Sequence, residues 1–146
     1  MNRQVFINLP VSDLKRSTEF YEALGFIKND TFSGEQASCM VWSDSIYVML
    51  LTHEFYRGFL QDKTIADTKT TSGVLLALSL KSKEEVQAFA DTAKANGGNV
   101  YQVDTGISED AMFGYEVQDP DGHNWEPMWM NPGYQPDQPD RPDQPE

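Results

Sequence analysis

The sequence is poor in the residues that build disulfide frameworks, zinc sites and nucleic-acid surfaces. Its 146 residues include one cysteine, Cys39, and two histidines. A single cysteine excludes an intrachain disulfide and a multi-cysteine zinc site. Lys and Arg number 11 against 23 Asp and Glu, which gives a net charge of −12. Nucleic acids and anionic membrane surfaces need a basic footprint, so we expect neither as a partner.

Long apolar stretches and nucleotide-binding motifs are also missing. No apolar run approaches the ~20 residues that span a bilayer, and Met1 is not followed by a signal-peptide pattern, so we expect a cytoplasmic protein. The motifs GxGxxG, GxxxxGK[ST], GxSxG and HExxH do not occur, which leaves dinucleotide, NTP, α/β-hydrolase and zincin chemistry without motif support. Hydrophobic residues make up 39 % of the chain and aromatic residues 12 %, enough to fill the interior of one domain.

The C-terminal segment differs in composition from the rest. Residues 133–146 read GYQPDQPDRPDQPE and contain four prolines. Proline lacks a backbone donor and fixes φ, so neither helix nor sheet is favoured there. We predict a disordered or polyproline II-like tail. A docking peptide is the alternative.

The remaining residues repeat one order of strand and helix signals. In the first half, alternation of apolar residues predicts strands at 4–11, about 26–32, 37–43 and 46–52, with a helix from Asp13 to Gly25. In the second half it predicts strands at 74–80, 99–103, about 112–118 and 124–130, with a helix that begins at a Ser82/Glu85 capping box. We therefore predict an α+β fold of two βαβββ modules in a single domain at 1–132, with module one at 1–52, a connector at 53–72 and module two at 73–132.

Two segments carry a family resemblance. They are the helix signature Asp13-Leu14…Ser17…Phe20-Tyr21…Leu24-Gly25-Phe26 and the ending Asp119-Pro120-Asp121-Gly122-His123…Glu126. In this order and separation they resemble the vicinal-oxygen-chelate superfamily of glyoxalases, fosfomycin-resistance enzymes, extradiol dioxygenases and bleomycin-resistance proteins. The resemblance implies curved sheets around a shared cleft. It also implies a divalent metal that acts as a Lewis acid, held by His, Glu or Gln on the first and last strands of each module.

The ligand positions implied by this resemblance hold mostly apolar residues. They fall at Phe6, Met49, Leu75 and Glu126. Phe and Leu cannot coordinate a metal, the Met thioether is too soft for these ions, and one carboxylate leaves too few ligands. The two histidines, His53 in the connector and His123 at a turn, do not lie within a predicted strand. We therefore expect no metal and no other cofactor, and we expect His123 to hydrogen-bond the turn.

Strand alternation and the resemblance together define a predicted cleft. We expect it to contain Phe6, Asn8, Met40, Trp42, Met49, Leu75, Phe113, Glu126 and Met128. Met and Trp suit an adaptable apolar pocket, although core or dimer packing is the alternative. Glu126 is the one ionisable group expected there. It would act as a general base or anchor a cationic ligand, or be a relic carboxylate satisfied by Asn8, water or a backbone donor.

These observations support three functional hypotheses. The first is a metal-free protein, similar to the bleomycin-resistance branch, that sequesters a cationic, partly aromatic small molecule. The second is a metal-dependent glyoxalase-like lyase, isomerase or dioxygenase that uses Glu126. The third is a partner-binding protein that uses the acidic tail. The resemblance and the apolar excess of the sheets imply a homodimer, but the sequence leaves open whether modules pair within one chain or swap between two.

Overall fold

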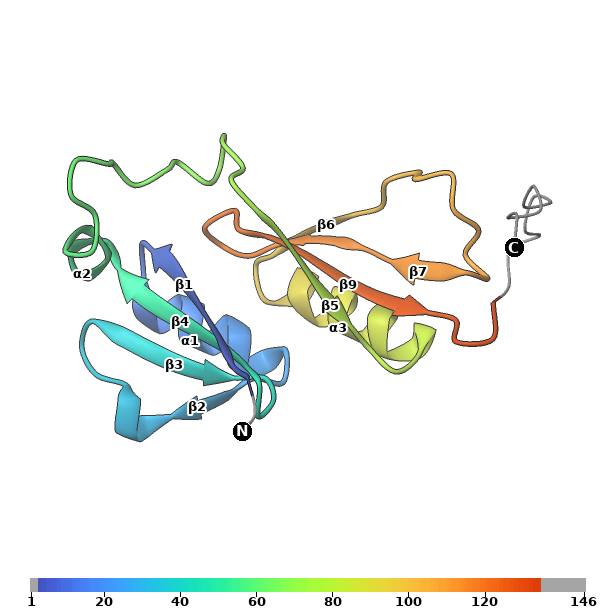
Figure 1. Cartoon of the computed structure of the whole chain (residues 1–146), viewed down its shortest axis with the longest axis horizontal. Coiled ribbons are helices and arrows are strands. Elements are labelled where there is room, and N and C mark those ends of the chain that lie inside the picture. Colours follow the sequence, from blue (N-terminus) through green and yellow to red (C-terminus); the bar gives the residue numbers. More distant parts are fainter. Residues whose placement is uncertain (1–2, 135–146) are drawn as a thin grey trace, which may run out of the picture.

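The computed structural model describes residues 3–134, which form two modules side by side (Figure 1). The first contains β1 (Val5–Val11), α1 (Leu14–Ala23), β2 (Ile27–Asn29), the 3-10 turn η1 (Asp30–Phe32), β3 (Ala37–Val41), β4 (Ile46–Thr52) and α2 (His53–Arg57). The second contains β5 (Leu75–Ser79), α3 (Lys83–Ala95), β6 (Asn99–Tyr101), β7 (Met112–Gly114), β8 (Glu116–Gln118) and β9 (Asn124–Met130). The predicted α+β class is confirmed. Most of the predicted tail, residues 135–146, lies outside the described residues.

Each module has one sheet with a helix on one face. The first sheet has the order β1-β4-β3-β2, and the second has the order β5-β9-β8-β6 with β7 also paired to β9. In both sheets the first strand of the module is an end strand that pairs in parallel with the last, β1 with β4 and β5 with β9. Figure 1 shows α1 behind the first sheet and α3 behind the second. Within residues 3–134, no helix is long and apolar enough to cross a membrane.

The two long helices begin where the sequence predicts, and α1 also ends there. Asp13 caps α1 by accepting a hydrogen bond from Arg16 N at 3.1 Å, and Gly25 follows its end with φ +103°. Ser82 caps α3 by accepting from Glu85 N at 3.1 Å. The Glu85 carboxylate accepts from Lys81 N at 3.0 Å, one residue earlier than the predicted capping box requires. Side-chain acceptors at these positions satisfy amides that have no partner within the helix.

The helix-facing sides of both sheets share one hydrophobic core. Its members come from β1, α1, β3, β4, β5, α3, β8 and β9 and include Leu9, Val11, Tyr21, Met40, Leu50, Leu78, Phe89, Val117 and Trp125. Side chains that alternate with these point to the opposite side of each sheet, which we call the open face. Several large apolar residues next to or on the open faces are exposed, among them Phe6 and Leu75. Any site formed by the sheets must therefore lie on the open faces.

Two predicted strands are interrupted or shortened. The predicted strand 112–118 is divided at Tyr115, whose amide donates to Pro127 O at 3.2 Å. Pro127 has no N–H, so the ladder cannot continue regularly at this point. The predicted strand 26–32 ends at Asn29, whose side chain accepts from Thr31 N at 3.0 Å and starts η1.

Candidate functional site

Three predicted cleft residues lie on the open face of the first sheet. The register pairs Phe6 with Tyr47 and Asn8 with Met49. The rings of Phe6 and Tyr47 are stacked, with centroids 4.5 Å apart and an interplanar angle of 12°. Asn8, which the sequence allowed as a partner of Glu126, instead donates from Nδ2 to Phe6 O at 3.2 Å. This face therefore offers mainly aromatic and thioether contacts.

Two other predicted cleft residues lie elsewhere. Met40 pairs with Val48 and is fully buried in the core beneath α1. Trp42 packs with its ring centroid 4.8 Å from that of Phe26 and 6.2 Å from that of Phe89 on α3. The cause is the register of the β3–β4 hairpin, which puts Cys39, and not Met40, opposite Met49. The prediction that Met40 and Trp42 line the cleft is corrected accordingly.

The second sheet holds the remaining predicted residues. Leu75, Glu126 and Met128 lie on its open face, since they alternate with Leu76, Trp125 and Pro127. Phe113 does not share that side, because it pairs with Trp129. Lys83 Nζ on α3 lies 5.9 Å from the Phe113 centroid and 5.5 Å from the Trp129 ring. Phe113 therefore turns its ring toward α3, and only borders the hollow described next.

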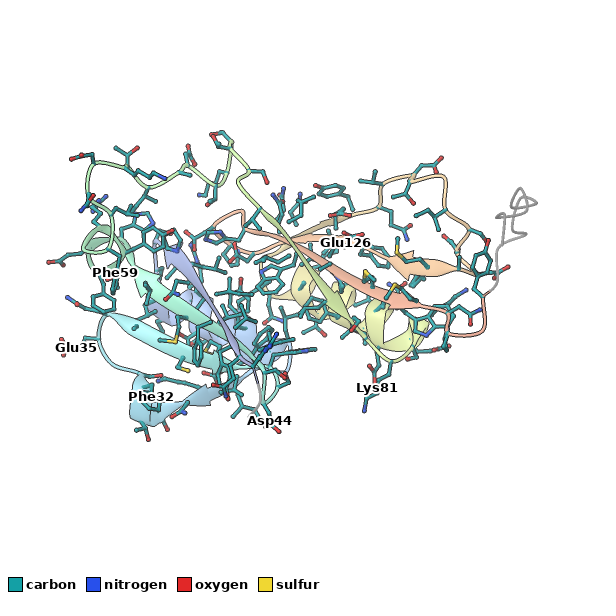
Figure 2. All side chains as sticks on the ribbon, in the orientation of Figure 1. Phe32, Glu35, Asp44, Phe59, Lys81 and Glu126 are labelled. Carbon is teal, nitrogen blue, oxygen red and sulfur yellow. The ribbon has the colours of Figure 1, made fainter. Side chains whose placement is uncertain are left out.

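A hollow of about 380 Å³ surrounds Glu126 and belongs entirely to the second module. Its walls are the segment 102–109 and parts of β7, β8 and β9. Four carboxylates line it, those of Asp104, Glu109, Glu116 and Glu126, together with Val103, Ile107 and Met112, and none of its described lining residues is Lys, Arg or His. Its volume is in the range of small-molecule sites. Figure 2 shows Glu126 on the second module, away from Phe32 on the first module and from Phe59 in the connector.

Two of these carboxylates face each other across neighbouring strands. The pairs Gly114–Met128 and Val117–Trp125 place Glu116 opposite Glu126 in the register. Partial burial, and next the charge of Glu126, raise the pKa of the Glu116 carboxyl. Like charges directly opposite each other on a sheet are destabilising. The pair is therefore predisposed to bind a proton or a cation.

Glu116 was not among the predicted site residues. The signal that indicates it is alternation around Val117, which faces the core and so places Glu116 and Gln118 on the open face. The prediction that Phe113 lies in the cleft obscured this pattern, because alternation from Phe113 puts Val117 on the open face and Glu116 on the helix-facing side.

The residues present do not fit the divalent metal that the family resemblance implies. Phe6 and Leu75 provide no donor atoms, and Met49 provides only a thioether. Within residues 3–134, no group of three or more His, Cys, Asp or Glu side chains is arranged to hold a metal ion. Tight sites for these metals need several nitrogen, oxygen or thiolate ligands.

Comparisons with known proteins agree with the sheets and helices described above. The family model of the Glyoxalase/Bleomycin resistance protein/Dioxygenase superfamily matches residues 3–126. No curated protein has a matching sequence. A hypothetical protein, SA1046 from S. aureus, is 26% identical, with 88% of this chain and 95% of that chain covered and a TM-score of 0.72.

Two further solved structures share the fold at lower identity. One is a glyoxalase/bleomycin resistance protein/dioxygenase family enzyme from Burkholderia phytofirmans PsJN, at 15% identity, 89% and 100% coverage and a TM-score of 0.71. The other is the genomically encoded fosfomycin resistance protein FosX from Listeria monocytogenes, at 17% identity, 92% and 96% coverage and a TM-score of 0.64. At these identities the likeness concerns the fold alone.

Proposed function

Because this chain belongs to the Glyoxalase/Bleomycin resistance protein/Dioxygenase superfamily but lacks suitable donors at three of the four implied ligand positions, we propose that it binds a small cationic molecule without a metal. The ligand is held and sequestered, not transformed. The observation that carries this proposal is the Glu116–Glu126 pair, which lies in a ligand-sized hollow whose lining, among residues 3–134, contains no Lys, Arg or His.

The chemistry of the hollow favours a cation that also has an apolar part. An ammonium or amidinium group between the two carboxylates relieves their repulsion. Each hydrogen bond between charged partners contributes about 1.5–3 kcal/mol. Val103, Ile107 and Met112 offer apolar contacts beside the carboxylates. An aromatic or aliphatic amine therefore matches both components.

We also propose that the protein is a homodimer in which the end strands β1 and β5 take part in the interface. Val5 and Phe6 on β1 are 48% and 49% exposed, and Val74 and Leu75 at β5 are 55% and 65% exposed. End strands with exposed apolar side chains tend to pair with another chain. In such a dimer, the stacked rings of Phe6 and Tyr47 of one copy would cover the hollow around Glu126 in the second module of the other copy.

Binding of a matched pair of probes tests the ligand class. Benzylamine is a cation at neutral pH, and benzyl alcohol is its neutral counterpart of similar size. We expect benzylamine to raise the melting temperature and to give a calorimetric binding signal, whereas benzyl alcohol does neither. Glu126→Gln should weaken benzylamine binding by about tenfold or more.

The matched control is Glu19→Gln, which makes the same charge change at an exposed position on α1. It should leave binding unchanged. Equal binding of the two probes, or equal loss in both variants, contradicts the proposal. Absence of any binding by benzylamine and by larger aromatic amines contradicts it as well.

An enzyme remains the alternative, and the position of Glu116 opposite Glu126 favours it. A carboxylate beside a carboxyl of raised pKa is the arrangement of a base and an acid. Glu126 would take a proton from a carbon next to a carbonyl, and Glu116 would return one, as a glyoxalase-like isomerase or lyase requires. Deuterium uptake from heavy water into an α-hydroxyketone, lost in Glu126→Gln, would support this alternative over sequestration.

Two other hypotheses have direct tests. Stoichiometric Zn, Ni, Mn or Fe in the purified protein would support a metal-dependent lyase or dioxygenase despite the donor set. Deletion of residues 133–146 with the loss of a bound partner protein would support the role of the acidic tail.

A further inference from the structure

The turn between β8 and β9, residues 119–123, is bound to the first module by side chains. Asp121 Oδ1 accepts hydrogen bonds from Ser12 N at 3.0 Å and from Ser12 Oγ at 2.6 Å. Its Oδ2 accepts from Ser17 Oγ at 3.3 Å and lies 3.6 Å from Arg16 Nη2. The side chain of Asp121 is 7% exposed. A carboxylate of the second module therefore meets four donors at the start of α1.

A second set of buried contacts crosses the same boundary. Tyr21 on α1 donates from its hydroxyl to Asp119 Oδ2 at 2.6 Å, and the same hydroxyl accepts from Trp125 Nε1 at 2.9 Å. Burial and the neighbouring carboxylate raise the pKa of Tyr21 well above its ordinary value, so the hydroxyl keeps its proton. His123 Nε2 donates to Pro10 O at 2.7 Å. Because Pro10 O can only accept, the proton of His123 must lie on Nε2.

The turn is also rigid in itself and is covered by the connector. Asp119 Oδ1 accepts from Asp121 N at 3.0 Å and from His123 N at 2.9 Å. Thr68 Oγ1 in the connector donates to Asp121 O at 2.6 Å. Gly122 has φ +90°, and a Cβ there would lie 2.4 Å from Thr68 O. Position 122, which lies against the backbone of Thr68 and Lys69 in the connector, therefore accommodates only glycine.

We propose that residues 119–123 are an intermodule latch, which fixes the second sheet against α1 and so limits the local opening of β5 and β9. Within the described residues, no buried side-chain nitrogen or oxygen lacks a partner, so removing one latch group leaves another unsatisfied. Among the residues that the structure describes, the matching turn of the first module, residues 43–45, makes its side-chain hydrogen bonds only within that module. The latch is therefore a device at one turn and not a general property of the repeat.

Amide hydrogen exchange of the full chain tests the latch. Tyr21→Phe keeps the ring but leaves Asp119 Oδ2 and Trp125 Nε1 without their partner. We expect exchange in β5 and β9 to rise about tenfold, although the substitution lies in the other module. The control is Ser38→Ala, which removes a buried hydroxyl 2.7 Å from Thr18 Oγ1 inside the first module. It should raise exchange in the first module only.

A milder variant covers the case in which Tyr21→Phe fails to fold. Ser12→Ala removes one hydrogen bond to Asp121 and keeps the backbone bond. It should raise exchange in β9 in the same direction, by a smaller factor. Unchanged exchange of β5 and β9 in both latch variants overturns the proposal. So does an equal rise in β5 and β9 in Ser38→Ala.

Discussion

The open face of the first sheet presents Phe6, stacked on Tyr47, and Met49, whereas the open face of the second presents Glu116 opposite Glu126. The helix-facing sides differ far less, because both contribute apolar residues to one core. Packing against a helix constrains those positions to apolar residues of suitable volume. The open faces carry no such constraint, so the two modules share one architecture but present different chemistry. The function should depend on that contrast.

The largest expected effect concerns how the two modules are held together. Gly122→Ala forces a Cβ into the Thr68 carbonyl and strains a positive φ, which should lower the free energy of unfolding by about 2–5 kcal/mol. The control is Gly25→Ala in the first module, where φ is +103° but the nearest atom to a Cβ is 4.0 Å away. It should cost about 1–2 kcal/mol. Urea denaturation measures the free energy of unfolding of both variants. Equal losses would mean that contact between Thr68 and the turn does not restrict residue 122.

The next effect concerns the apolar face. Phe6→Asp places a charge on the end strand β1 and should weaken dimer association by about 2 kcal/mol, or roughly 30-fold. Ile27→Asp is the matched variant, because Ile27 is 72% exposed on β2 at the far end of the same sheet. It should leave association unchanged. Sedimentation velocity distinguishes them, and a wild-type chain that is monomeric at micromolar concentration rules out the interface.

A smaller effect concerns the acidic face. The folded-state pKa of Glu116 lies above its ordinary value of 4.5. As pH rises above that value, the folded chain holds its proton more tightly than the unfolded chain, so stability falls until the raised pKa is passed. Glu116→Gln should therefore stabilise the fold on the order of 0.5 kcal/mol at about pH 7 and give no gain at about pH 4. Thermal unfolding at the two pH values measures this, and a loss at neutral pH contradicts it.

The smallest effect concerns the rim of the hollow. Asp104 is exposed, and its Oδ1 accepts from Gly106 N at 2.9 Å, a bond that asparagine can keep. Asp104→Asn should weaken benzylamine binding only about twofold, since an exposed charge is screened by water and salt. Isothermal titration at low and high salt checks this. A loss of benzylamine affinity as large as that of Glu126→Gln would mean that the segment 102–109, and not the Glu116–Glu126 pair, provides the main contact with the ligand.

The sequence predicted the regular parts of the fold well and the cross-strand partnerships less well. The strands at 46–52 and 124–130 and the caps at Asp13 and Ser82 follow from local patterns, which determine local structure. Which side of the first sheet Met40 and Trp42 occupy depends on the register of the β3–β4 hairpin. The pairing of Glu116 with Glu126 depends on the register of β9 with β7 and β8 on either side of Pro127. The bond from His123 to Pro10 joins residues 113 apart. No local pattern specifies such a contact.

The latch also bears on the order in which a growing chain can fold. Ser12 leaves the ribosome 109 residues before Asp121, and Tyr21 leaves 98 residues before Asp119. Until Asp119 and Trp125 are synthesised, the side of Tyr21 that contacts them in the folded protein has no partner in the nascent first half. Early segments of a chain with exposed apolar surface are prone to aggregate or to engage chaperones. The last strands to be made are therefore the ones that complete the first half.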